Sequence, residues 1–61
     1  MGNNMIPSDP VMLLSFMNLK LRDYYTSLDA LCDDLELSKV QIEEKLAIID
    51  YHYDQERNQF M

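Results

Sequence analysis

The order of apolar and polar residues along the chain predicts a long first helix. Residues 11–25 are mostly apolar, and their clear polar stripe at helical spacing is Ser15, Asn18 and Arg22. Asp9 and Pro10 mark the helix start, because an Asp side chain caps free backbone N–H groups and Pro has a fixed φ that suits the first helical position. An apolar surface this wide indicates either the central helix of the core or a helix with a second, exposed apolar face.

Two shorter helices joined by a tight turn follow. Thr26 or Ser27 can cap the first of them. Its apolar residues have the i, i+3, i+4, i+7 spacing of one buried stripe: Leu28, Leu31, Cys32 and Leu35. Ser38, with Gln41 three residues later, predicts a capping box at the start of the next helix. The buried stripe of that helix continues through Ile42, Leu46 and Ile49.

After the third helix the apolar period shortens from near four to two. Tyr51 and Tyr53 alternate with His52, residues 54–58 are polar and suit a turn, and Phe60 resumes the apolar pattern. This pattern predicts a short β-hairpin. Since two strands alone are unstable, the three aromatic side chains should pack on the helices.

The predicted fold is therefore mainly α. It is a three-helix domain with helix-turn-helix-like second and third helices and a short C-terminal β-hairpin. The domain spans residues 9–61, and residues 1–8 form a flexible N-terminal arm that Pro7 stiffens near its end.

The length of the chain makes self-association a reasonable expectation. A domain of 61 residues buries only about 60% of the surface that its unfolded chain exposes. Cores this small often need a second copy or another protein. The apolar excess of the first helix supplies a candidate protein interface, which consists of Met12, Phe16, Met17 and Leu19. We expect a homodimer or a complex with another protein.

The formal net charge of −6 disfavours nucleic acid and anionic lipid as partners, because like charges repel. The first ten residues have no basic region ahead of their apolar residues, and no apolar run approaches the roughly 20 residues that span a bilayer. Cys32 is the single cysteine, so it is expected to be a small core residue in a reducing compartment. We expect a soluble, cytoplasmic protein without a membrane partner.

Chemistry-bearing motifs are sparse. His52 is the single histidine and falls in a predicted strand, and the single Gly is at position 2, so no glycine-rich phosphate loop is possible. Cys32 and His52 lack the spacing of a zinc module. We therefore expect no catalytic, cofactor-binding or metal-ligating residues, and no enzyme activity.

Three segments of the chain, "DP.MLLS", "N.KLRD" and "SLD.LC.D", carry a family resemblance. With them, residues 7–60 resemble a family of small bacterial proteins classed as a domain of unknown function, number 4250 of that series. The resemblance implies a bacterial origin and a compact fold. The family brings no catalytic or binding residues that can be placed on this sequence.

A weaker resemblance is to winged helix-turn-helix domains, with the hairpin as the wing. The core positions of that motif are matched by Leu31, Cys32, Leu35, Leu37, Ile42 and Leu46. Glu36 is a departure, because these motifs usually have Gly at the turn. In such a domain the DNA contacts would be Lys39, Gln41 and Arg57, but Glu43 and Glu44 would oppose phosphates on the same helix.

Two function classes thus follow from the sequence. The first is an uncharacterised, non-catalytic module for protein interaction or self-association. The alternative is a winged helix-turn-helix regulator that binds DNA. The charge balance favours the first.

Overall fold

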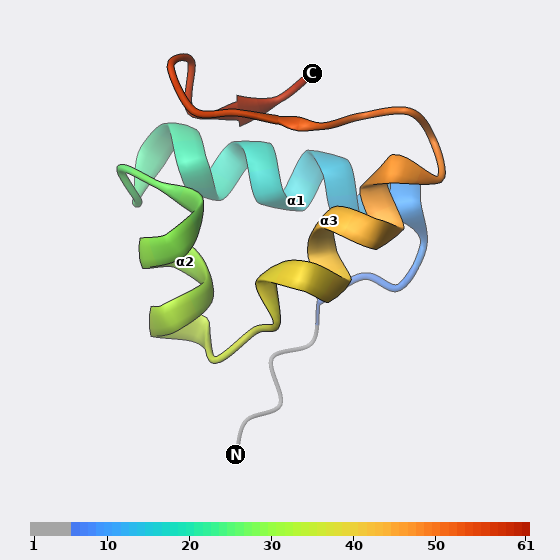
Figure 1. Ribbon diagram of the computed structural model, residues 1–61. Helices are drawn as coiled ribbons and strands as arrows, with labels where there is room; N and C mark the ends of the chain where they lie inside the picture. Colours follow the sequence, from blue (N-terminus) through green and yellow to red (C-terminus); the bar gives the residue numbers. More distant parts are fainter. Residues whose placement is uncertain (1–5) are drawn as a thin grey trace.

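The computed structural model describes residues 6–61, which form three helices and one antiparallel hairpin (Figure 1). The elements in chain order are α1 (Pro10–Asp23), α2 (Leu28–Leu35), α3 (Lys39–Ala47), β1 (Tyr53–Asp54) and β2 (Gln59–Phe60). α1 contacts α2, α3 and β2, so it is the central element of the domain. The mainly α three-helix architecture and its C-terminal hairpin are confirmed.

The helix starts follow the predicted caps. The Asp9 carboxylate accepts a hydrogen bond from the N–H of Met12 at 3.1 Å, and Pro10 is the first residue of α1. Ser27, and not Thr26, caps α2 by accepting from the N–H of Ala30 at 3.0 Å. At α3, the Ser38 hydroxyl accepts from the N–H of Gln41 at 3.3 Å, which is the Ser half of the predicted capping box.

The turn between α2 and α3 has the backbone geometry that usually requires glycine. Glu36 lies in the left-handed region, with φ 58° and ψ 45°. The N–H of Leu37 bonds the C=O of Cys32 at 2.8 Å, which closes a Schellman motif. A residue with a Cβ in this conformation costs about 1 kcal/mol. The chain therefore makes the expected turn with a Glu that is locally unfavourable.

We predict that Glu36→Gly stabilises the protein by about 1 kcal/mol. Gly removes the left-handed penalty, and the change removes a negative charge from the C-terminal end of α2, where the helix dipole disfavours it. The measurement is the urea midpoint followed by circular dichroism. Glu56→Gly is the matched control, because Glu56 is exposed in the hairpin turn and does not have a positive φ. Equal shifts for the two variants would contradict the backbone explanation.

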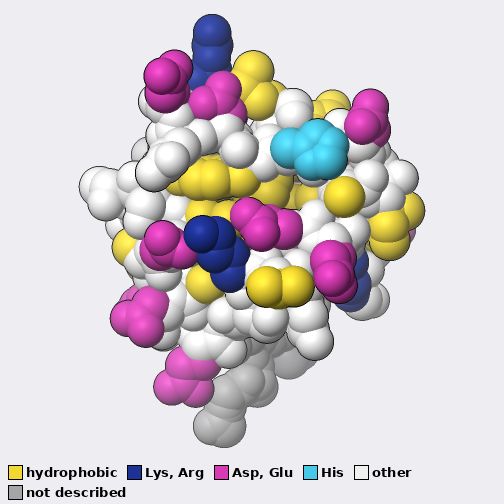
Figure 2. All heavy atoms as spheres, viewed as in Figure 1, with side chains coloured by type: hydrophobic (Ala, Val, Ile, Leu, Met, Phe, Trp, Pro, Cys, Tyr) yellow, Lys and Arg dark blue, Asp and Glu magenta, His cyan; other side chains and the backbone are white. Residues whose placement is uncertain are grey.

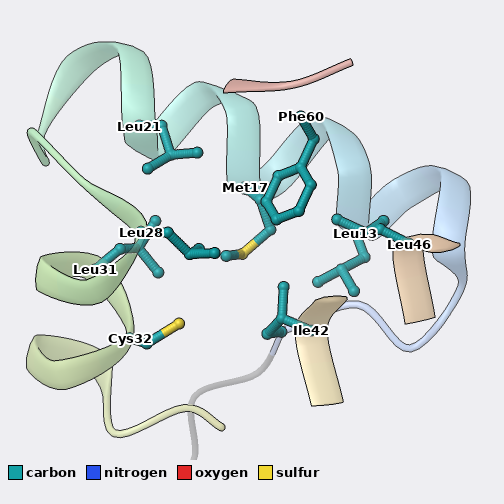
Figure 3. Close-up of a cluster of buried hydrophobic side chains, with 9 residues drawn as sticks. All are labelled: Leu13, Met17, Leu21, Leu28, Leu31, Cys32, Ile42, Leu46 and Phe60. Carbon is teal, nitrogen blue, oxygen red and sulfur yellow. The ribbon is translucent and has the colours of Figure 1, made fainter. Parts of the chain in front are cut away.

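The core is one cluster of nine buried apolar side chains contributed by all three helices and by β2 (Figure 3). They are Leu13, Met17, Leu21, Leu28, Leu31, Cys32, Ile42, Leu46 and Phe60. The members on α1 recur every four residues, as one face of a helix does. Figure 3 shows the Phe60 ring next to Met17, so β2 contributes to the core beside α1.

One expectation about packing is wrong, at the start of the predicted hairpin. Tyr51 is 37% exposed and does not pack on the core. Its N–H bonds the C=O of Leu46 at 3.0 Å after a left-handed Asp50, so Tyr51 completes the end of α3 and does not belong to the strand. In the predicted arm, Ile6 packs against the core cluster. Residues 1–5 of that arm lie outside the described residues.

Two asparagines attach the hairpin to the helices. Asn18 of α1 uses both ends of its amide on Phe60: Nδ2 donates to the C=O at 3.1 Å, and Oδ1 accepts from the N–H at 2.7 Å. Asn58 donates from Nδ2 to the C=O groups of Leu21 at 3.0 Å and Tyr25 at 2.9 Å. Because half-buried carbonyls need partners, these bonds fix where the hairpin lies on α1.

The hydroxyl of Tyr53 extends this polar contact to α2. It donates to Oδ1 of Asn58 at 2.6 Å and accepts from the N–H of Leu28, the first residue of α2, at 3.1 Å. The Tyr53 ring lies 5.5 Å from that of Phe60, centroid to centroid. One side chain of β1 therefore connects the hairpin turn, the start of α2 and the core.

Candidate interaction surfaces

The outward side of α1 stays apolar after folding. Met12 is 61% exposed and Leu19 is 45% exposed, and Val11 beside Met12 is also exposed. Phe16 lies between them at helical spacing and is half-buried against the core cluster. We call Val11, Met12, Phe16 and Leu19 the α1 face. The predicted second apolar side of the first helix therefore exists.

Met17 was wrongly included in the predicted interface. Its side chain is fully buried among the core residues (Figure 3). Met17 lies four residues from Leu13 and from Leu21, which are also buried, so it shares their inward direction. A partner has no access to it without unfolding of the domain.

The α1 helix carries more basic than acidic side chains, whereas the chain as a whole is acidic. Asp23 is the single acidic residue of α1, and it accepts two hydrogen bonds from Arg22, at 3.0 and 3.1 Å. The Lys20 ammonium lies 5.5 Å from the centre of the Phe16 ring and 4.9 Å from that of Tyr24. This helix is thus slightly cationic in a protein of net charge −6.

The candidate DNA contacts do not form a free basic patch. The Lys39 ammonium lies 2.8 Å from the Asp29 carboxylate, and this hydrogen bond raises the pKa of Lys39. Arg57 lies 3.8 Å from Asp54 within the hairpin. Gln41 is exposed on α3. Both cations already have carboxylate partners, which opposes their use on phosphates.

A groove runs between α3 and β1, and sequence reasoning did not find it. It consists of two adjoining hollows of about 370 Å³ and about 240 Å³ that share Glu43 and Tyr53. The larger hollow is lined by Val40, Glu43, Glu44, Ala47, His52, Tyr53 and Phe60. Figure 2 shows hydrophobic side chains at the bottom of this hollow, between the hairpin and α3, with charged side chains at its border.

β1 has an outer edge on the side away from β2, and main-chain groups at this edge do not bond to the other strand. His52 and Met61 exchange two main-chain hydrogen bonds, at 3.1 and 3.0 Å. The next pair, Tyr53 and Phe60, exchanges none, because such pairs alternate along an antiparallel ladder. Asn18 satisfies the outward groups of Phe60. By the same alternation, the N–H and C=O of Tyr53 point away from β2.

Metal-binding side chains do not cluster in the described part of the chain. No group of three or more His, Cys, Asp or Glu side chains within residues 6–61 could hold a metal ion. His52 is exposed, with Nε2 3.6 Å from a carboxylate oxygen of Asp50. Cys32 is buried, and desolvation, followed by the nearby Asp29, raises the pKa of its thiol. A raised pKa disfavours the reactive thiolate.

Comparison with protein families identifies the chain. Residues 7–60 match the family described as Domain of unknown function (DUF4250). The chain belongs to this family. The match spans all the helices and strands described above, so the DUF4250 domain is the three-helix unit together with its hairpin.

Neither the comparison with curated proteins nor that with solved structures gives a match. The likeness of this DUF4250 domain to winged helix-turn-helix domains stays a prediction from the sequence. In the part of the chain that the structure describes, no helix has the length and apolar character needed to cross a membrane.

Proposed function

We propose that this DUF4250 protein is a non-catalytic module that self-associates through the α1 face. One observation supports this proposal most strongly. Met12 and Leu19 stay exposed on the outward side of α1 although the helix already supplies three side chains to a core of nine. Contiguous exposed apolar side chains on a small domain are typical of a protein interface.

The charges favour a second copy as the occupant of the α1 face. Two chains of net charge −6 repel each other at most orientations. Contact through α1 keeps the acidic residues of α2, α3 and the hairpin away from the interface. In an antiparallel, two-fold symmetric pairing, the exposed Asp9 at the start of one α1 would lie near Lys20 at the end of the other.

The proposed interface is small, and the expected affinity follows from that. A standard interface takes about 800 Å² from each partner, whereas the whole chain exposes 4240 Å². The α1 face offers three exposed apolar side chains and the edge of Phe16. We expect a reversible dimer with a dissociation constant of about 10 µM, because a small interface leaves little surplus after the loss of translational freedom.

Sedimentation equilibrium over a wide concentration range tests the proposal. We predict that the wild type is a dimer at high concentration, and that Met12→Asp and Leu19→Asp are monomers. Val40→Asp is the matched control, because Val40 on α3 is 61% exposed, as Met12 is. A wild type that stays monomeric at millimolar concentration would contradict self-association, and so would an equal effect of the Val40 change.

The cytoplasmic location is part of the same proposal. It is supported by the free thiol of Cys32, which is buried and has no disulfide partner within the described residues. Free buried thiols are usual in reducing compartments.

A further inference from the structure

We propose that the groove between α3 and β1 binds an extended peptide segment of another protein, which adds a strand to the free edge of β1. The segment would carry Lys or Arg side chains among apolar ones. This function goes beyond self-association, since it uses α3 and the hairpin and not the α1 face.

The two edges of the hairpin differ in their main-chain hydrogen bonds, and this difference supports the proposal. On the β2 side, the amide of Asn18 bonds both outward main-chain groups of Phe60, at 3.1 and 2.7 Å. On the β1 side, the main-chain groups of Tyr53 point away from β2, and Tyr53 is a residue that lines both hollows of the groove. An extended peptide would give Tyr53 the same pair of bonds that Asn18 gives Phe60. Adding a strand to an exposed edge is a recurrent way of binding peptides.

The walls of the groove indicate the chemistry of the peptide. Val40 and Ala47 supply apolar surface, and Glu43 and Glu44 supply two carboxylates on the same helix. Asp29 already pairs with Lys39 in the adjoining hollow, so that cation is neutralised. An occupant therefore needs apolar side chains for the groove and cationic ones for Glu43 and Glu44.

The same charges argue against other occupants. Phosphates of a nucleic acid would meet two carboxylates. A second copy of this chain would bring a further net charge of −6 to a wall that is already acidic. A basic segment of a different protein is the occupant that the charges attract.

The test is a titration of the ¹⁵N-labelled protein with a synthetic capped heptapeptide in which Val and Lys alternate. We expect the Tyr53 amide resonance to move downfield and its hydrogen exchange to slow about tenfold, because its N–H gains an acceptor. The same peptide with N-methyl groups on its central amides should bind about fivefold more weakly, since it loses main-chain hydrogen bonds. Replacing its Lys residues by Glu should abolish binding.

Protein variants test the role of the acidic wall. The double change Glu43→Gln and Glu44→Gln should weaken the Val and Lys peptide about fivefold. Glu56→Gln is the control, because Glu56 is exposed in the hairpin turn and lines neither hollow. The Leu19→Asp variant should bind the peptide as the wild type does, which separates this inference from self-association.

Several outcomes would overturn the inference. They are no binding at millimolar peptide, binding without a change at Tyr53, equal affinity of the N-methylated peptide, or equal effects of Glu56→Gln and the double change. Shifts at Tyr53 that grow with protein concentration in the absence of peptide would show that a second copy occupies the groove.

Discussion

Asn58→Asp is expected to destabilise the protein by about 3 kcal/mol at neutral pH. The substitution keeps the size of the side chain and its tolerance of the left-handed backbone, which has φ 54° at this residue. It replaces the Nδ2 donor by an oxygen that faces the carbonyl oxygens of Leu21 and Tyr25. Each half-buried carbonyl left without its donor costs about 1 to 3 kcal/mol.

The expected effect depends on pH in a definite direction. The folded state favours the protonated form of the introduced carboxyl, because only that form can donate to a carbonyl oxygen, so its pKa is raised above the unfolded value. The penalty is thus fully present well above neutral pH and shrinks as the pH falls through that raised pKa. Below the unfolded pKa of about 4, about half of it should remain, because the protonated carboxyl has one O–H for two carbonyl oxygens.

Urea unfolding at several pH values measures the effect of Asn58→Asp relative to the wild type. Gln55→Glu is the matched control, since it makes the same change from amide to carboxylate at an exposed residue of the same turn. It should change the free energy of unfolding by less than about 0.5 kcal/mol. If the two variants unfold at the same midpoint, Asn58 does not anchor the hairpin.

Phe60→Ala is expected to cost about 4 kcal/mol, which is the usual cost of removing a fully buried Phe side chain. Phe60 is 1% exposed, and its ring contacts that of Tyr53. A domain of this length has a total stability of about 3 to 9 kcal/mol. The variant should therefore be largely unfolded, or close to it, at 37 °C.

Thermal unfolding by circular dichroism checks this prediction. The neighbouring Met61 is 48% exposed, so Met61→Ala should change the midpoint by a few degrees at most. Phe60→Leu should lie between the two, because it keeps part of the buried volume. If Phe60→Ala and Met61→Ala unfolded at the same temperature, the hairpin would not be a part of the core.

α1 carries two apolar rows, and the sequence pattern does not decide which of them is buried. Leu13, Met17 and Leu21 form one apolar row, and Met12, Phe16 and Leu19 form another on the same helix. Helical spacing identifies both rows, but it does not say which row faces the other helices. The predicted interface mixed the two rows, because it grouped Met17 with Met12, Phe16 and Leu19. Packing against α2, α3 and β2 decided the matter.

The groove was missed for a related reason. The sequence places Glu43 and Glu44 on the exposed side of the third helix, but it does not say what lies opposite them. The available signal was weak: Val40 and Ala47 are apolar residues outside the buried stripe of Ile42 and Leu46. Only the placement of β1 beside α3 turns this side into one wall of a groove.

The sequence by itself determined the helix starts, the place of the turn at Glu36 and the existence of the hairpin. These features depend on groups that are close in sequence, such as Ser38 with Gln41, Cys32 with Leu37 and Tyr53 with Phe60, so local order is enough to specify them. The tertiary structure decided which apolar row is buried, which edge of the hairpin is free and where the groove lies. Those features depend on contacts between distant segments, as between Asn18 and Phe60, which are 42 residues apart. Such contacts form only when the helices pack, and packing is a property of the whole chain.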